Sequence, residues 1–153
     1  MTQNYEICRG ETADIETIVQ FQIAMAMESE GTALDREKVR KGVTSAMKDD
    51  SKGTYFVARR HGQAIGSMML TLEWSDWNNG WYWWIQSVYV MPEHRQAGVF
   101  KAMYTYLKEA AKEQGIPEIR LYVDKTNIKA QNAYHKLGMQ ESHYMIFEDH
   151  INK

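Results

Sequence analysis

Cysteine is nearly absent from this chain of 153 residues, which contains only Cys8. One cysteine cannot form an internal disulfide, so we expect a protein of the reducing cytoplasm. The polar start, residues 1–6, lacks the apolar segment of a signal peptide, which supports the same expectation. The chain also lacks an apolar run of about 18 residues, so we expect no membrane-spanning helix.

An excess of positive charge is missing as well. The net charge is −2, and Lys and Arg are scattered along the sequence. Sequence-independent nucleic-acid binders need a basic surface, so we expect no nucleic-acid partner. The five histidines show no metal-ligand spacing, which favours surface or half-buried histidines over a zinc site. We therefore expect no metal.

The hydrophobic pattern predicts one domain over residues 1–153, an α/β (α+β) protein with helices on the faces of a mixed sheet. Strands are expected at residues 5–9, 54–59, 64–74, 81–91, 118–124 and 142–148. Helices are expected at residues 12–29, with Thr12 as a possible cap, from the cap Asp35 through Met47, at 98–115 and at 127–137.

A strand, a short loop and a helix follow one another around Pro92. The strand at residues 85–90 stops at Met91-Pro92, and Gly98 opens the next helix. Backbone N–H groups at such a helix start form a nest that binds phosphate. One glycine is weak evidence, so an ordinary strand-to-helix turn is the alternative. The local cluster of His94, Arg95 and Lys101 favours a phosphate site.

Two motifs carry a family resemblance. Residues 90–98, Val-Met-Pro-Glu-His-Arg-Gln-Ala-Gly, resemble the acetyl-CoA-binding motif of the GNAT N-acetyltransferases, which reads Arg/Gln-x-x-Gly-x-Gly/Ala after a strand. Asn127-Ile128-Lys129-Ala130, followed by Tyr134-His135-Lys136-Leu137-Gly138-Met139, is similar to the family's second motif, a helix that ends in Tyr-x-x-x-Gly-(Phe/Met). The resemblance covers nearly the whole chain in element order and is closest over residues 85–139. It implies a GNAT fold with a central sheet of six to seven strands, a splay between the two cofactor strands, and about four helices.

The resemblance also implies residue roles, with acetyl-CoA as the acyl donor. The backbone of Val88, Tyr89 and Val90 would pair with the pantetheine arm. Asn127 would hydrogen-bond the cofactor, and Tyr134 would point at its sulfur. The residues that would surround the pyrophosphate are Arg95, Gln96, Ala97, Gly98, Val99, Phe100 and Lys101.

Two positions depart from the family pattern. Phe100 replaces the usual third small residue of the loop. Either the helix sits slightly differently, or only the preceding amides reach the pyrophosphate. Gln86 occupies the strand position often held by a general-base Glu, and an amide cannot take up a proton at neutral pH.

Acetyl transfer to an amine sets its own chemical requirements. An alkylamine has a pKa near ~10.4, so a group must remove its proton. A backbone N–H on the strand, that of Val88 or Tyr89, can stabilise the oxyanion. A thiol has a pKa near ~8.5 and a phenol near ~10, so Tyr134 can protonate the leaving thiolate with a modest uphill step. Without the resemblance, Tyr134 would be interpreted as a helix-packing aromatic residue.

Carboxylates near the expected acceptor cleft supply candidates for the base. Glu28 and Glu30 end the first helix and Glu73 ends a central strand, and we favour Glu28 or Glu73. The alternative is that each is a solvated surface charge.

All five tryptophans fall within residues 74–84, on the hairpin before the cofactor strand. Because side chains alternate along a strand, Trp81 and Trp83 should face one way and Tyr82 and Trp84 the other. One interpretation is core on one side and a homodimer interface on the other. The other is an aromatic wall for a cationic amine, backed by Asp76 and Glu73. The predicted substrate-binding residues are Glu30, Trp74, Asp76, Trp84 and Gln86.

These observations predict an acetyl-CoA-dependent N-acetyltransferase that acts on a primary amine of a small molecule such as a polyamine or diamine. One alternative acceptor is a protein N-terminus or lysine. The other alternative is a non-catalytic acyl-CoA-binding module, which the replacements at Gln86 and Phe100 suggest and Tyr134 argues against.

Overall fold

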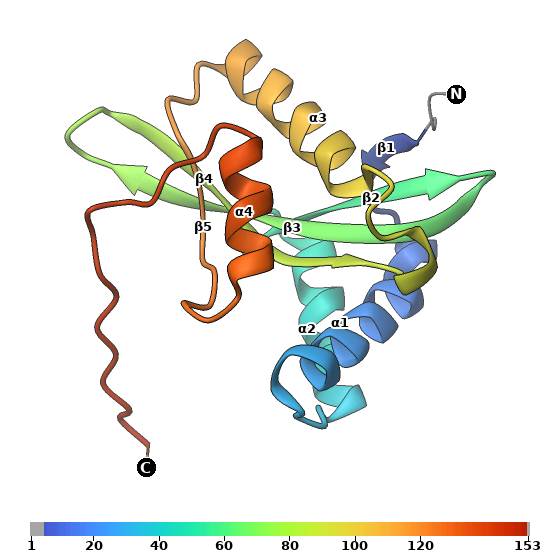
Figure 1. The fold of residues 1–153 in the computed structure, drawn as a ribbon. Helices are drawn as coiled ribbons and strands as arrows, with labels where there is room; N and C mark the ends of the chain where they lie inside the picture. The colour runs from blue at the N-terminus through green and yellow to red at the C-terminus, as the bar shows by residue number, and fades with distance from the viewer. Residues whose placement is uncertain (1–4, 153) are drawn as a thin grey trace. The chain divides into compact units, whose positions relative to one another are not determined.

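The computed structural model describes residues 5–152, so most of the polar start lies outside the described residues. The chain divides into two compact units, residues 1–122 and 123–153. The larger unit contains a five-stranded sheet in the order β1-β2-β3-β4-β5. Its neighbours are antiparallel except for the parallel pair β4 and β5. Figure 1 shows this sheet with α3 on one face and α1 and α2 on the other.

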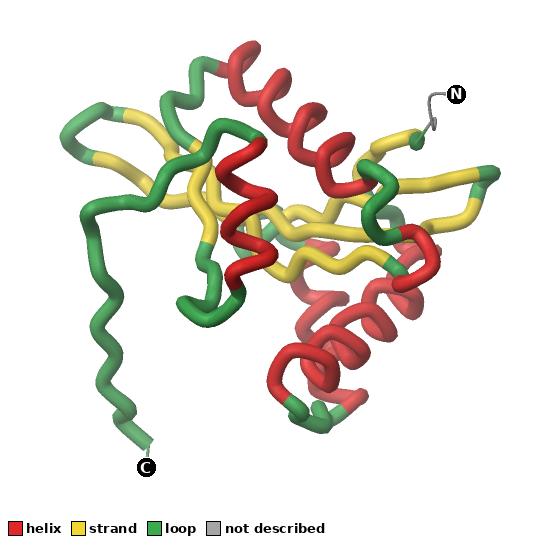
Figure 2. The backbone as a smooth tube through the Cα atoms, viewed as in Figure 1, coloured by secondary structure: helices red, strands yellow, loops and turns green. Residues whose placement is uncertain are grey.

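The bounds of the elements are close to those that the sequence predicts. The strands are β1 (Glu6–Arg9), β2 (Thr54–Arg60), β3 (Gln63–Ser75), β4 (Gly80–Val90) and β5 (Ile119–Leu121). The helices are α1 (Ile15–Glu30), α2 (Arg36–Lys48), α3 (Val99–Gln114) and α4 (Ile128–Lys136), with short 3-10 turns at Thr12–Asp14 and Pro92–His94. Figure 2 shows the same assignment along the backbone.

Alternation along β2 divides the core between the two faces of the sheet. Tyr55 and Val57 pack with the helical residues Ile18, Val19, Val43 and Ala46 in one buried cluster on the side of α1 and α2. Phe56, which lies between them in sequence, contacts Tyr106 of α3, with ring centroids 5.7 Å apart. The buried residues of α3 recur at helical spacing: Val99, Met103, Tyr104, Leu107 and Ala111.

The first helix starts differently from the prediction. Thr12 is not its cap, because a 3-10 turn precedes α1 and the carboxylate of Asp14 accepts the backbone N–H of Glu11 at 2.8 Å. The same carboxylate binds Arg59 of β2 at 2.6 Å. Asp14 therefore connects the start of α1 to the sheet, which Thr12 could not do.

The strand count also differs from the prediction. Residues 5–152 contain five strands rather than six to seven, because the strand expected at residues 142–148 is not formed. Figure 2 draws the chain after α4 as loop. The apolar side chains of this segment are exposed: Tyr144, Met145, Ile146 and Phe147. A segment with high strand propensity forms a strand only when its backbone pairs with that of a neighbouring strand. The sequence of the segment does not indicate whether such a neighbour is present.

Candidate active site

The loop between β4 and α3 has the backbone geometry of an anion-binding nest. Gln96 and Gly98 both have positive φ, 61° and 85°. Gly98 precedes α3, and no side chain caps this helix start. The first N–H groups of a helix have no carbonyl partners within it, so those of α3 are available to a ligand. The hydroxyl of Tyr5 donates to the Ala97 carbonyl at 3.1 Å, which fixes one peptide of the loop.

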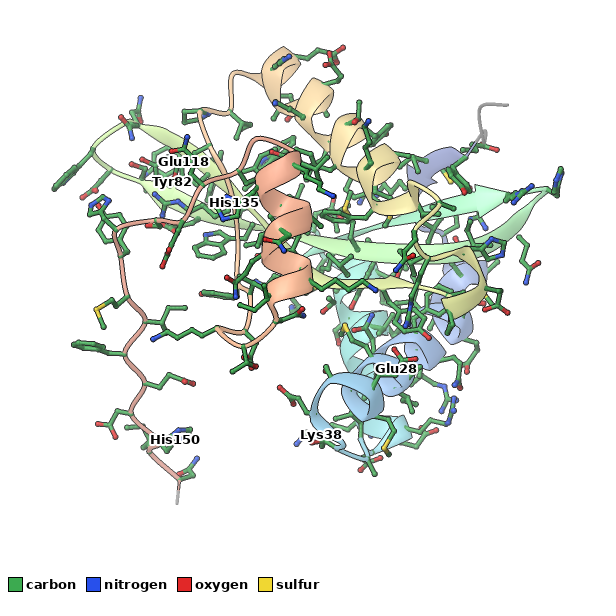
Figure 3. The ribbon with its side chains drawn as sticks, in the orientation of Figure 1. Glu28, Lys38, Tyr82, Glu118, His135 and His150 are labelled. Atoms are coloured by element: carbon green, nitrogen blue, oxygen red, sulfur yellow. The ribbon has the colours of Figure 1, made fainter. Side chains whose placement is uncertain are left out.

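Arg95, the first residue of this loop motif, has its side chain bound on two sides. Its Nε donates to the Val90 carbonyl at 2.8 Å, and its Nη2 lies 2.7 Å from Oε2 of Glu28 on α1. Figure 3 labels Glu28 near the end of that helix. Tyr89, which is buried, lies beneath the Arg95 guanidinium, with 5.3 Å between the guanidinium carbon and the ring centroid.

The strand β4 leaves its parallel neighbour early, as the predicted splay requires. Pairing with β5 covers only Trp83, Trp84 and Ile85, whereas β4 continues to Val90. A bulge follows at this point: Gln86 pairs with Met69 and Tyr89 with Ser67. Ser87, inside the bulge, has a positive φ of 54°. A bulge turns backbone groups out of the regular ladder, so this part of β4 can direct an N–H toward a ligand.

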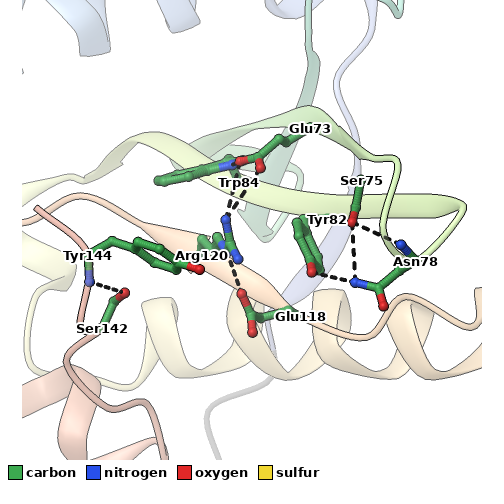
Figure 4. A network of polar contacts seen from close by, with 9 residues as sticks. All are labelled: Glu73, Ser75, Asn78, Tyr82, Trp84, Glu118, Arg120, Ser142 and Tyr144. Atoms are coloured by element: carbon green, nitrogen blue, oxygen red, sulfur yellow. Dashed lines mark hydrogen bonds and ion pairs between the residues drawn. The ribbon is translucent and has the colours of Figure 1, made fainter. Parts of the chain in front are cut away.

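Glu73 lies on the same face of β3 as Met69, which packs against the α1/α2 cluster, and it belongs to a network of polar contacts (Figure 4). Its carboxylate accepts the indole N–H of Trp84 at 2.8 Å and lies 3.4 Å from Nη1 of Arg120. Arg120 also pairs with Glu118 and lies over the ring of Tyr82, 4.1 Å from its centroid. Burial alone would lower the pKa of Arg120, but the two carboxylates outweigh it and raise that pKa. The guanidinium is therefore permanently charged.

The predicted acceptor residues are only partly brought together. Trp84 and Gln86 share the α1/α2 face with Glu73, and Gln86 donates to Thr71 at 2.8 Å. Trp74 lies on the opposite face, where its ring meets Trp81 at 4.9 Å between centroids. The alternation predicted for residues 81–84 is thus confirmed. Asp76 lies in the exposed hairpin turn and Glu30 at the exposed end of α1.

The smaller unit contains the second motif. Asn127 caps α4, because its side-chain oxygen accepts the N–H of Ala130 at 3.1 Å. Tyr134 lies two residues before the end of α4 and is half-buried, and this burial raises its pKa. Its hydroxyl is therefore protonated throughout the neutral range.

Comparison with known proteins decides the family. The model of the GNAT acetyltransferase family matches residues 18–139. A crystal structure of a possible acetyltransferase from Clostridium difficile 630 is 38% identical, with a TM-score of 0.91, over 97% of this chain and 99% of that chain.

The chain belongs to the GNAT family of acetyltransferases.

More distant structures share the GNAT fold. A predicted acetyltransferase with acetyl-CoA from Clostridium acetobutylicum is 18% identical, with a TM-score of 0.76, over 95% of this chain and 96% of that one. AAC(6')-Iy in complex with the bisubstrate analogue CoA-S-monomethyl-acetylneamine is 17% identical, with a TM-score of 0.77, over 96% and 98%. No curated protein matches the chain.

As a member of the GNAT family, this chain is an acetyl-CoA-dependent N-acetyltransferase. Within residues 5–152, no cluster of His, Cys, Asp or Glu is arranged to hold a metal ion, and no helix there is both long and apolar enough to cross a membrane. Arg120 is the residue that the sequence analysis missed. No sequence pattern indicates Arg120, because only the parallel pairing of β5 with β4 sets it opposite Trp84.

Proposed function

We propose that this GNAT enzyme transfers an acetyl group from acetyl-CoA to a primary amine of a small cation such as a diamine or polyamine. The observation that supports this acceptor class is the network around Arg120. Tyr82 and Trp84 already accommodate one cation, the Arg120 guanidinium, on the α1/α2 face. The two carboxylates beside it, Glu73 and Glu118, leave one negative charge on this surface. Aromatic rings next to excess carboxylate charge attract alkylammonium groups.

The donor would bind along the loop and the splayed strand. The amides of Gln96 to Lys101 would surround the pyrophosphate, and the backbone of Val88 to Val90 would pair with the pantetheine arm, because the bulge and the early end of β5 leave that edge of β4 open. Phe100 would not block this mode, since its ring lies along α3 beside Tyr104, with centroids 6.2 Å apart. The side-chain oxygen of Asn127 already accepts the N–H of Ala130, so Asn127 would contact the cofactor through its other polar groups.

The reaction would proceed by addition and elimination. The neutral amine nitrogen attacks the thioester carbonyl carbon, and an N–H of Val88 or Tyr89 stabilises the resulting oxyanion. The carbon–sulfur bond then breaks, and the thiolate takes a proton from Tyr134. We propose Glu73, acting through water, as the base that takes the proton lost by the amine. It shares its sheet face with Gln86, the position where a base is often found in the family.

A steady-state assay with acetyl-CoA and a panel of amines tests this function. The panel contains diamines, polyamines, neutral monoamines and peptides with a free N-terminus or a lysine. We expect the highest kcat/KM for a diamine or polyamine. In the Glu73→Gln variant, kcat should fall by about 10²-fold or more and lose its dependence on pH near neutrality. A preference for peptides would refute the acceptor class, and unchanged kcat from pH 6 to 9 would refute Glu73 as the base.

A homodimer is also proposed, through the β3–β4 hairpin. Trp77 at its tip is 93% exposed, and Leu72, Trp74 and Trp81 on one face are also exposed. Apolar patches of this kind mark interaction sites on soluble proteins.

A further inference from the structure

Glu28 lies at a junction of α1, the end of β4 and the loop before α3. Phe21, two turns earlier on the same face of α1, packs against Tyr89, with ring centroids 5.1 Å apart. Glu28 reaches Arg95 at 2.7 Å, and Arg95 returns to the Val90 carbonyl at 2.8 Å. One helix face therefore holds both the last residues of β4 and the first residue of the loop.

These contacts determine where the Arg95 side chain lies. An arginine side chain has many rotamers, and ordering it on ligand binding costs about 0.5–1.5 kcal/mol. Here Glu28 and Val90 hold the guanidinium from two directions, and the Tyr89 ring supports it from below. Burial, followed by the negative charge of Glu28, raises the pKa of Tyr89, so this phenol remains neutral beneath the guanidinium. The residue that follows, Gln96, already has the left-handed backbone of the nest.

We propose that Glu28 is a positioning residue that orders the pyrophosphate-binding loop through Arg95, and that it is not the general base. This inference rests on the proposed binding of acetyl-CoA at that loop. It assigns the diphosphate of CoA as the ligand group that gains from Glu28. Arg95 holds Oε2 of Glu28 at the loop.

The consequence for binding is specific to ligands that contain the diphosphate. The Glu28–Arg95 pair is more than 40% exposed on both sides, and exposed ion pairs add little to stability, so Glu28→Gln should fold like wild type. Without the pair, Arg95 keeps only its bond to Val90 and its contact with Tyr89, so more of its ordering takes place when the ligand binds. The dissociation constant of CoA should rise about three- to tenfold, the range that follows from the ordering cost of one such side chain. The dissociation constant of pantetheine, which lacks the diphosphate, should not change.

The test compares calorimetric titrations of CoA and pantetheine into the full-length wild type and its variants. Arg95→Met removes the guanidinium but keeps the stem. If Glu28 acts through Arg95, the double variant Glu28→Gln/Arg95→Met should bind CoA no more weakly than Arg95→Met alone. Glu16→Gln is the matched control, because Glu16 lies on α1 like Glu28 but pairs with Arg40 of α2 and not with Arg95. It should leave the affinity for CoA unchanged.

Kinetics of Glu28→Gln at saturating acetyl-CoA separate positioning from catalysis. We expect kcat and its pH profile to match those of the wild type, with only KM for acetyl-CoA raised. A fall in kcat with a flattened pH profile would make Glu28 the base and overturn the inference, as would equal weakening of CoA and pantetheine.

The same titrations distinguish this inference from the proposed function. If wild type binds pantetheine as well as CoA, the loop does not hold the diphosphate, and both the proposed mode of donor binding and the role of Glu28 fail. If wild type prefers CoA and Glu28→Gln keeps the full preference, only the role of Glu28 fails.

Discussion

At the scale of single residues, the contacts of a side chain indicate its role more closely than its chemical type does. Glu28 and Glu73 are both carboxylates near the expected site, yet the first binds the loop arginine and the second binds an indole and Arg120. Tyr134 differs from both, because burial raises its pKa and keeps its hydroxyl protonated. A protonated phenol is suited to give a proton to a thiolate.

Tyr134→Phe should lower kcat by roughly 10²-fold while the affinity for acetyl-CoA stays nearly the same. Phenylalanine fills almost the same space, so packing should be conserved. Because the pKa of Tyr134 is raised, the wild-type rate should show no loss from its deprotonation below about pH 10. Pre-steady-state rates across pH provide the measurement, and full activity in the variant would make the hydroxyl structural.

At the scale of elements, the candidate site lies where regular structure is interrupted. β4 bulges at Ser87 and continues beyond its pairing with β5. The backbone of the next loop is left-handed at Gln96 and Gly98, before α3 begins. A β-carbon at Gly98 would meet no atom within 4 Å, so space does not restrict this position. Its positive φ does restrict it, and the diphosphate would do so as well in the proposed mode of binding.

Gly98→Asp should weaken CoA binding by more than tenfold, and Gly98→Asn should weaken it much less. Asn and Asp have similar shape and both tolerate a left-handed backbone, so the comparison isolates the negative charge placed where phosphates approach. Titration of CoA into both variants, with thermal unfolding as the folding control, measures the difference. Equal affinities would place the diphosphate elsewhere.

At the scale of the whole molecule, the β3–β4 hairpin of the larger unit carries large apolar side chains that the core of that unit does not cover. Its inner half carries buried Trp83 and Ile85, whereas Trp74, Trp77 and Trp81 near the tip are exposed. If two hairpins pack together by a twofold axis, each tryptophan patch covers its equivalent.

Light scattering should give wild type the mass of two chains and Trp77→Glu the mass of one. Trp77 is almost fully exposed, so its replacement removes little from the fold of one chain. Trp77→Phe, which keeps an aromatic ring, should remain a dimer. A monomeric wild type, or a Trp77→Glu variant that stays dimeric, would contradict this interface.

The order of the elements and most of the nest could be predicted from the sequence by itself, because those features depend on local rules. Apolar periodicity, the caps of helices and the stops at Pro92, Gly115 and Pro117 act over a few residues. The loop proposed to bind the diphosphate is equally local: a strand, Gly98 and a helix start follow each other directly, and the structure has the left-handed turns there. The prediction of one domain over residues 1–153 remains a prediction.

Pairings between distant residues were decided only by the tertiary structure. Arg120 contacts Glu73 because β5 lies parallel to β4. Glu28 pairs with Arg95, which lies 67 positions later in the sequence. The segment at residues 142–148 shows the opposite case, since its strand-like composition found no strand partner within residues 5–152. A periodic pattern states which face of an element is apolar. It does not state which element, or which charged side chain, will lie against that face, because this depends on how all the elements pack at once.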